Sequence, residues 1–221
     1  MAAHPREHSR MPALDRSAAD FIPPGRLSLP KLDAAAQGCR GCDLYKRATR
    51  AVFGQGPRAA RIVMVGEQPG DQEDLAGEPF VGPAGRVLDE SLRAAGIDRE
   101  LVYITNAVKH FKWTPRGKRR MHSKPSAREI KACRPWLEHE MALIQPEVVV
   151  CMGATASQSL LGNSFRLTRH RGEFIEGTRW APAVLATIHP SAILRMPDQQ
   201  ARRMAREEFV RDLILIRGRL G

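Results

Sequence analysis

The chain has 221 residues, of which 43% are hydrophobic and 27% charged, enough to bury one sizeable α/β core. Its 35 Lys and Arg against 24 Asp and Glu leave a net charge of +11, which favours a polyanionic partner. No apolar run reaches the roughly 18 residues of a membrane span, and no signal-peptide core is evident, so we expect a cytoplasmic protein without a membrane partner. The four cysteines are then expected to bind metal or stay reduced.

The order of patterns along the chain predicts a tail followed by one domain. Residues 1–36 are rich in Pro, Arg, Ala and Ser without periodicity, and we expect a partly flexible tail. Residues 37–221 alternate between strand and helix patterns. Four apolar, β-branched runs predict buried parallel strands, at 61–66, 101–108, 147–153 and 182–190. The predicted fold is a three-layer α/β/α domain with a central, mostly parallel four-stranded sheet.

Helices are predicted between these strands. One follows Gly82 and ends at Gly96, a residue typical of helix C-termini. Ser126 and Glu129 form a capping-box pattern that opens a second helix, in which Pro135 is expected to cause a kink or a restart. Two further helices are predicted at 154–162 and around an apolar stripe at 205–216.

The loop after the first predicted strand reads GEQPGDQEDLAGEPFVGPAGRVLD, residues 66–89. Its glycines and prolines indicate a shaped loop, but it matches neither a P-loop nor a dinucleotide fingerprint. It offers carboxylates, an amide and an aromatic ring, at Glu67, Gln68, Asp71, Glu73, Asp74 and Phe80. The acids could face a developing cation, cap the next helix or bind a hydrated metal.

Two other strand ends carry polar groups. Asn106 ends the second strand, where its amide could read the edge of a base or simply form a turn. The fourth strand ends in HPSAILR, in which His189 could donate to a carbonyl oxygen and Arg195 could hold a phosphate. A His-Pro pair at a strand end is also commonly structural. Polar groups at the carboxyl ends of parallel strands are expected to gather at one site.

The cysteines indicate a metal site. Cys39 and Cys42 form CRGC, a pair at metal-ligand spacing, and Cys133 lies about ninety residues later in a predicted helix. His110 and Cys151 compete as the fourth ligand. Either zinc or an iron–sulfur cluster would suit such a set.

The stretch GKRRMHSKP, residues 117–125, surrounds His122 with cations. A solvated loop is one interpretation, since charge runs usually lie in water. The other is a functional histidine, because neighbouring cations disfavour the protonated ring and a neutral imidazole is a nucleophile.

Together these motifs resemble the iron–sulfur uracil-DNA glycosylases of families 4 and X. The resemblance covers about residues 39–216 and rests on the loop at 66–89 and on TNAVKH, SAREIKACRPWL, GATA and HPSAILR. Gln68 and the basic histidine insert point to family X over family 4, although the insert has Met121 where isoleucine is usual.

The resemblance implies that uracil is flipped out of single- or double-stranded DNA and its N-glycosidic bond is broken through an oxocarbenium-like sugar. In family X a histidine of the insert then stays bonded to C1′, which gives a covalent adduct and a single turnover. By position, His122 is that nucleophile, Glu67 faces the sugar cation and His189 stabilises the leaving base. The implied substrate-binding residues are Gly66, Gln68, Asp71, Phe80, Asn106 and Arg195, and the implied DNA-backbone contacts are Lys118, Arg119 and Arg120.

The resemblance also implies a [4Fe–4S] cluster held by Cys39, Cys42 and Cys133. The fourth family 4 cysteine is His110 in this chain, so we predict His110 as the fourth ligand, with Cys151 as the alternative. Two other functions stay open: an ordinary hydrolytic uracil-DNA glycosylase, and a non-enzymatic iron–sulfur protein that binds nucleic acid. We expect a monomer.

Overall fold

A computed structural model describes residues 16–220. Its centre is a five-stranded sheet with the strand order β2-β1-β5-β7-β6. The strands are β1 (Ile62–Gly66), β2 (Val102–Asn106), β5 (Val148–Met152), β6 (Phe174–Glu176) and β7 (Ala183–Thr187). All neighbours are parallel except β6, which runs antiparallel to β7. The four predicted parallel strands are confirmed, but the prediction of a four-stranded sheet was one strand short, because β6 is only three residues long and lacks an apolar run.

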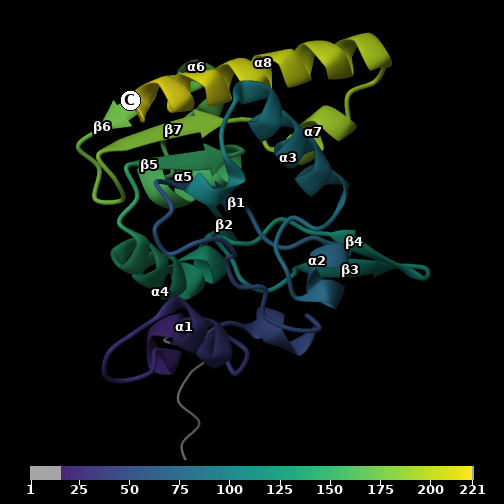
Figure 1. The fold of residues 1–221 in the computed structure, drawn as a ribbon. Helices are drawn as coiled ribbons and strands as arrows, with labels where there is room; N and C mark the ends of the chain where they lie inside the picture. Colours follow the sequence, from purple (N-terminus) through teal and green to yellow (C-terminus); the bar gives the residue numbers. More distant parts are fainter. Residues whose placement is uncertain (1–15, 221) are drawn as a thin grey trace, which may run out of the picture.

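Helices cover both faces of this sheet (Figure 1). Because successive side chains of a strand point to opposite faces, Met64 packs in one core and Val63 in the other. The first core lies under α3 (Pro83–Ala95), α7 (Pro190–Leu194) and α8 (Gln199–Arg219). The second lies under α4 (Ala127–Ile144) and α5 (Ala154–Leu161). The predicted three-layer α/β/α architecture is therefore present.

The helix ends follow the signals read from the sequence. Gly96 caps α3 in the left-handed region, with φ of 69°. Ser126 and Glu129 form the complete capping box of α4. One helix continues through Pro135, so the helix does not restart there. Short helices after β1 are α2 (Asp71–Ala76), α6 (Leu167–His170) and η3 (Arg99–Leu101). No helix in the range 16–220 combines the length and the apolar character needed to cross a membrane.

The segment before β1 packs beside α4. It contains η1 (Ala18–Phe21), α1 (Leu29–Ala36) and η2 (Asp43–Lys46). Its apolar side chains form a third core with residues of α4, and Leu32 is fully buried there. The predicted tail, 1–36, thus contains packed helices in its described part, and residues 1–15 lie outside the described residues.

A two-stranded hairpin stands apart from the main sheet, next to α2 (Figure 1). Its strands are β3 (Trp113–Arg116) and β4 (Arg119–His122), with Trp113 opposite His122. Gly117 turns the chain between them with φ of 59°, a conformation that glycine adopts without strain. The interpretation of this stretch as a solvated loop is only partly correct, because Arg119–His122 form strand β4, whereas Lys118 lies in the turn and Lys124 follows the strand. The charges of Arg119 and Arg120 mask the strand pattern in the sequence.

Candidate active site

A cavity of about 730 Å³ opens at the carboxyl ends of the parallel strands. This is the edge at which α/β sheets place their ligands. Seven of the predicted site residues line the cavity: Glu67, Gln68, Phe80, Asn106, His122, His189 and Arg195. The chain therefore brings together residues that are up to 128 positions apart, from Glu67 to Arg195.

Asn106 ends β2 directly beside Gly66, the last residue of β1. Its side chain is buried, and Oδ1 is an acceptor without a hydrogen-bond partner in the described structure. A Cβ atom on Gly66 would collide with this Oδ1 and would reach 3.0 Å from the ring of Phe80. Gly66 therefore has no side chain with which to bind a ligand. Its small size leaves room for the side chains of Asn106 and Phe80, which can bind one.

Phe80 is held in an uncommon backbone conformation. Its φ is 58°, a left-handed value that is strained for a residue with a bulky side chain. The loop around it is fixed by Glu73, whose Oε1 accepts a hydrogen bond from the Gly82 amide at 3.0 Å. The Phe80 ring lies 5.6 Å from the His189 ring at an angle of 33°. An aromatic face is thereby presented to the cavity, where a flat base could stack.

His189 is neutral, with a defined proton position. Burial, assisted by the charges of Arg195 and His122, lowers its pKa to about 4. The Ser191 amide donates to Nδ1 at 3.1 Å, so Nδ1 is an acceptor and the proton of the neutral ring is on Nε2. Arg195 donates to the Ser191 hydroxyl at 3.1 Å and supports the same turn. His189 can therefore donate one hydrogen bond from Nε2 to a ligand.

His122 meets a carboxylate instead of cations. Its Nε2 lies 3.3 Å from Oε1 of Glu67, and half of the His122 side chain is exposed. Arg120 is turned inward, where it forms ion pairs with Asp71 and Asp74, both at 2.6 Å. The expectations that Arg120 contacts the DNA backbone and that Asp71 binds substrate are not matched by this geometry, because the two side chains bind each other.

Gln68 ties the first loop to the hairpin. Its amide nitrogen donates to the carbonyl oxygens of Lys112 and Ser123, both at 3.1 Å, and its Oε1 accepts from the Lys112 amide at 3.1 Å. Lys112 precedes β3 and Ser123 follows β4, so one side chain clamps both ends of the hairpin. Gln68 was expected to bind substrate; its polar atoms instead position the element that carries His122.

Two of the predicted DNA contacts, Lys118 and Arg119, are exposed at the tip of the hairpin, as is Arg116 opposite Arg119. Lys124 was not among the predicted site residues but lines the cavity, as do Glu73 and Thr155. The sequence contained a signal for Lys124, since it belongs to the same basic stretch as His122. Thr155 belongs to the GATA motif at the start of α5, but no role in the site was predicted for it.

Three of the four cysteines share the core beside α4. Cys39 and Cys133 are buried and Cys42 is half-buried in that core. Trp136 donates to the Cys39 sulfur at 3.4 Å, and the Lys109 amide donates to the Cys133 sulfur at 3.2 Å. Burial raises the pKa of Cys42 to about 11 and that of Cys133 to about 12.

The fourth-ligand candidates differ in position. His110 directly follows Lys109 and is buried, which lowers its pKa to about 4 and keeps the imidazole neutral, as a ligand must be. Cys151 lies in β5 and packs in a different core, together with Val63 and Leu137. Among residues 16–220, no three His, Cys, Asp or Glu side chains are arranged to hold a metal ion. Three thiols, two of them accepting N–H donors, and a neutral imidazole are nevertheless the donor types that suit an iron–sulfur cluster.

Comparison with known proteins places the chain in a family. The model of the uracil DNA glycosylase superfamily matches residues 53–214. The type-4 uracil-DNA glycosylase of Archaeoglobus fulgidus is 40% identical over 192 residues, which cover 84% of this chain and 89% of that protein. That of Thermotoga maritima is 40% identical over 174 residues, 77% of this chain and 85% of that protein. A type-5 uracil-DNA glycosylase of Thermus thermophilus is 31% identical over 184 residues, 75% of this chain and 78% of that protein. The chain therefore belongs to the uracil DNA glycosylase superfamily.

Proposed function

We propose that this protein excises uracil from DNA and that His122 becomes bonded to C1′ of the resulting abasic site. One observation carries the proposal. An unpartnered amide oxygen, a neutral histidine donor, a carboxylate and a second histidine meet in one cavity, from Asn106, His189, Glu67 and His122. These groups correspond to the tasks of reading a base, expelling it and receiving the sugar.

Base recognition falls to Asn106 and Phe80. The free Oδ1 of Asn106 needs a donor, and uracil offers N3–H beside its O4 acceptor, which the amide nitrogen can reach. Cytosine presents an acceptor at N3 and a donor at C4, the opposite pattern. Phe80 supplies the face on which the flipped base stacks.

Cleavage of the glycosidic bond places negative charge on the uracil and positive charge on the sugar. The Nε2–H of His189 would donate to the O2 oxygen of the departing uracil anion. Such a donor acts most strongly in a site that excludes water. The Glu67 carboxylate would face the sugar, where it stabilises the developing cation.

The second half of the reaction uses His122. The C1′–N1 bond breaks first, and its electron pair leaves on uracil while the Glu67 carboxylate faces the sugar cation. The proton on Nε2 of His122 then passes to Glu67, whose Oε1 lies 3.3 Å away, and this frees the lone pair with which Nε2 forms the new bond to C1′. The charges balance, because one carboxylate becomes neutral while one uracil anion is released. In the hydrolytic alternative, water would take the place of His122 and Glu67 would accept the proton of water.

The DNA backbone would meet the exposed hairpin tip. Lys118, Arg119 and the cavity-lining Lys124 have no ion-pair partner among residues 16–220, so they are free to contact phosphates. The net charge of +11 supports the same partner.

We also propose that Cys39, Cys42, Cys133 and His110 hold a [4Fe–4S] cluster. The first two ligands come from the segment before β1, and Cys133 comes from α4. When bound, the cluster would supply a structural cross-link between these parts of the chain and would take no part in bond cleavage. Cys151 does not share the core of the other cysteines, which favours His110 as the fourth ligand.

The proposed activity is tested with an end-labelled oligonucleotide that contains one uracil. Heating in alkali should cleave the strand at a free abasic site, whereas a sugar bonded to His122 has no free aldehyde and should instead appear as a slowly migrating, protein-linked species on a denaturing gel. A matched oligonucleotide with thymine should stay intact. Intact uracil DNA after incubation with cluster-loaded protein would contradict the proposal and would leave a non-catalytic DNA-binding protein as the better interpretation.

A further inference from the structure

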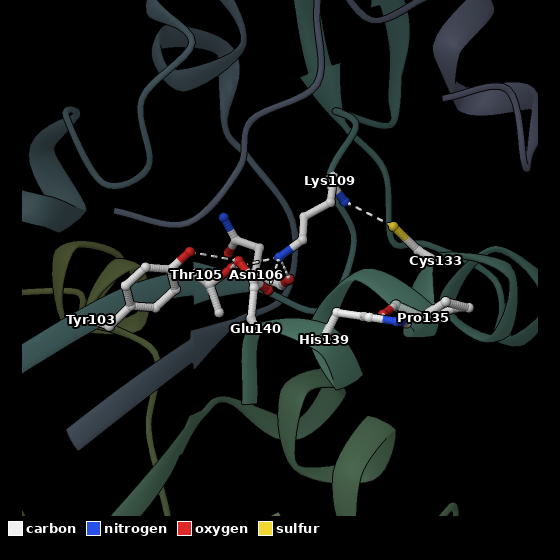
Figure 2. A network of polar contacts seen from close by, with 8 residues as sticks. All are labelled: Tyr103, Thr105, Asn106, Lys109, Cys133, Pro135, His139 and Glu140. Carbon is white, nitrogen blue, oxygen red and sulfur yellow. Dashed lines mark hydrogen bonds and ion pairs between the residues drawn. The ribbon is translucent and has the colours of Figure 1, made fainter. Parts of the chain in front are cut away.

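A fully buried ion pair lies directly behind Asn106 (Figure 2). Lys109 and Glu140 are both 0% exposed at their side chains, and Lys109 Nζ lies 2.6 Å from Oε2 of Glu140. The other two donor bonds of the ammonium go to Oγ1 of Thr105 at 2.5 Å and to the main-chain oxygen of Asn106 at 3.0 Å. An ammonium has three protons, and all three are used.

The carboxylate of Glu140 is equally well bonded. Its Oε1 accepts from the hydroxyl groups of Tyr103 and Thr105, both at 2.9 Å. Burial and the neighbouring carboxylate raise the pKa of Tyr103, so its phenol stays a donor. Tyr103, Thr105 and Asn106 all belong to β2, and Glu140 belongs to α4. The network therefore joins the end of β2 to the helix behind it.

Packing alone does not require this arrangement. Burying two charges carries a large desolvation cost, and replacing such a pair by apolar residues of similar volume is often neutral or stabilising. What an apolar pair would not supply is the bond from the ammonium to the Asn106 carbonyl. Within residues 16–220, β2 is the edge strand of the sheet. On its outer side Gln55 forms a single β-bridge with Ile104, but no strand there reaches Asn106, the last residue of β2.

The main chain of Lys109 is held as well. Its amide donates to the Cys133 sulfur at 3.2 Å, and its carbonyl oxygen accepts from the Val52 amide at 2.7 Å. The Lys109 side chain thus reaches back to Asn106 from a main chain that is itself anchored at two points (Figure 2). This gives Lys109 a fixed base from which to hold the neighbouring strand end.

We propose that Lys109, held in place by Glu140, is a positioning residue that fixes Asn106 for reading the base. The inference rests on the proposed function, because it assigns Lys109 a role in uracil excision through Asn106. Lys109 does not touch the cavity, so its effect must pass through the Asn106 main chain.

The test is a double-mutant cycle in the cluster-loaded protein. The double substitution Lys109→Met with Glu140→Gln, called the pair swap below, replaces both charged side chains by neutral ones. It keeps an acceptor for Tyr103 and Thr105 but removes the hydrogen bond to the Asn106 carbonyl. The swap should slow single-turnover uracil release about tenfold or more. In an Asn106→Ala background the same swap should change the rate by less than about twofold, because neighbouring groups that act as one unit are not additive.

Two measurements separate positioning from a general structural role. The thermal unfolding midpoint and the visible absorption of the pair swap should stay close to those of the wild type. Tyr103→Phe is the matched control, since it removes one hydrogen bond of the network and leaves the Lys109–Asn106 bond intact. Its uracil release should stay within about twofold of the wild-type rate.

A swap that releases uracil at the wild-type rate would overturn the proposal, and so would an equal loss of rate in both backgrounds. Should the swap not fold, Glu140→Asp takes its place, because the shorter carboxylate draws the ammonium away from Asn106. Its loss of rate should again vanish in the Asn106→Ala background, and an equal loss in both would overturn the proposal. The wild-type protein, measured in the same series, distinguishes a failure of this proposal from a failure of the proposed function. If the wild type releases no uracil, it is the proposed function that fails.

Discussion

At the residue scale, the cavity is defined by polar atoms that the fold leaves free. Within residues 16–220 the Oδ1 atom of Asn106 is buried without a hydrogen-bond partner, and His189 has one ring nitrogen bonded to its own turn and the other available. A buried acceptor without a donor lowers stability, so its persistence in a cavity indicates a ligand that completes the hydrogen bond.

Replacement of Asn106 by alanine should therefore slow uracil release. An unpaired base edge in a buried site costs roughly 1–3 kcal/mol, which corresponds to about 5-fold to 150-fold in rate. Single-turnover kinetics on a uracil oligonucleotide measure this loss. A variant that releases uracil as fast as the wild type would remove Asn106 from base recognition.

His189 also predicts a pH dependence of stability. Its pKa is lowered to about 4 in the folded protein, against about 6.5 in an unfolded chain. Between these values the unfolded state binds a proton that the folded state does not, so the free energy of unfolding falls as the pH is lowered. The slope from this group is at most about 1.4 kcal/mol per pH unit.

Replacement of His189 by glutamine removes this titration and keeps an acceptor for the Ser191 amide. Chemical denaturation at pH 7 and pH 5 should show a smaller loss of stability in the variant, by about 1–2 kcal/mol. An equal loss in both proteins would show that His189 is not held neutral by the fold.

At the element scale, the hairpin explains how a histidine from a basic stretch reaches the cavity. Its register places His122 opposite Trp113, and the Gln68 amide clamps both ends of the hairpin. The sequence showed that the insert was basic and contained a histidine, but not that it formed two strands. Strand pairing of this kind depends on contacts with α2, in particular the ion pair between Arg120 and Asp74.

Gln68→Ala should loosen the hairpin without touching the groups that expel uracil. Covalent capture by His122 should slow about tenfold, because the variant leaves the Lys112 and Ser123 carbonyl groups without their side-chain donor. Release of uracil should change much less. Quantifying both products on one denaturing gel decides the matter, and an equal slowing of both would contradict the role of Gln68 as a clamp.

At the scale of the whole molecule, the chain joins a sheet with its cavity to an N-terminal segment that contains two cysteines. The parallel strands and the cavity at their ends could be predicted, because apolar β-branched runs and the polar residues after them are local in the sequence. Seven predicted site residues do line that cavity. The inward turn of Arg120 could not be predicted, since it depends on the buried carboxylate of Asp74, a contact across 46 positions.

The proposed cluster gives a prediction at the same scale. Purified protein should be brown and contain about four irons with matching sulfide. His110→Ala should lose iron, whereas Cys151→Ala should retain it, because Cys151 packs in the other core. Iron and sulfide analysis of the two variants tests the assignment. Loss of iron only in Cys151→Ala would move the fourth ligand to Cys151, and stoichiometric zinc without sulfide would refute the cluster.

The central claim is that His122 forms a bond to C1′, and the most direct measurement is a denaturing gel of labelled uracil DNA after incubation with the wild type and with His122→Ala. The wild type should give a slowly migrating species that survives boiling in detergent, and the variant should give none while it still releases uracil. Proteolysis and mass spectrometry should locate the DNA on His122. A wild type that releases uracil without any stable adduct, or an adduct that forms equally well in His122→Ala, would contradict the account.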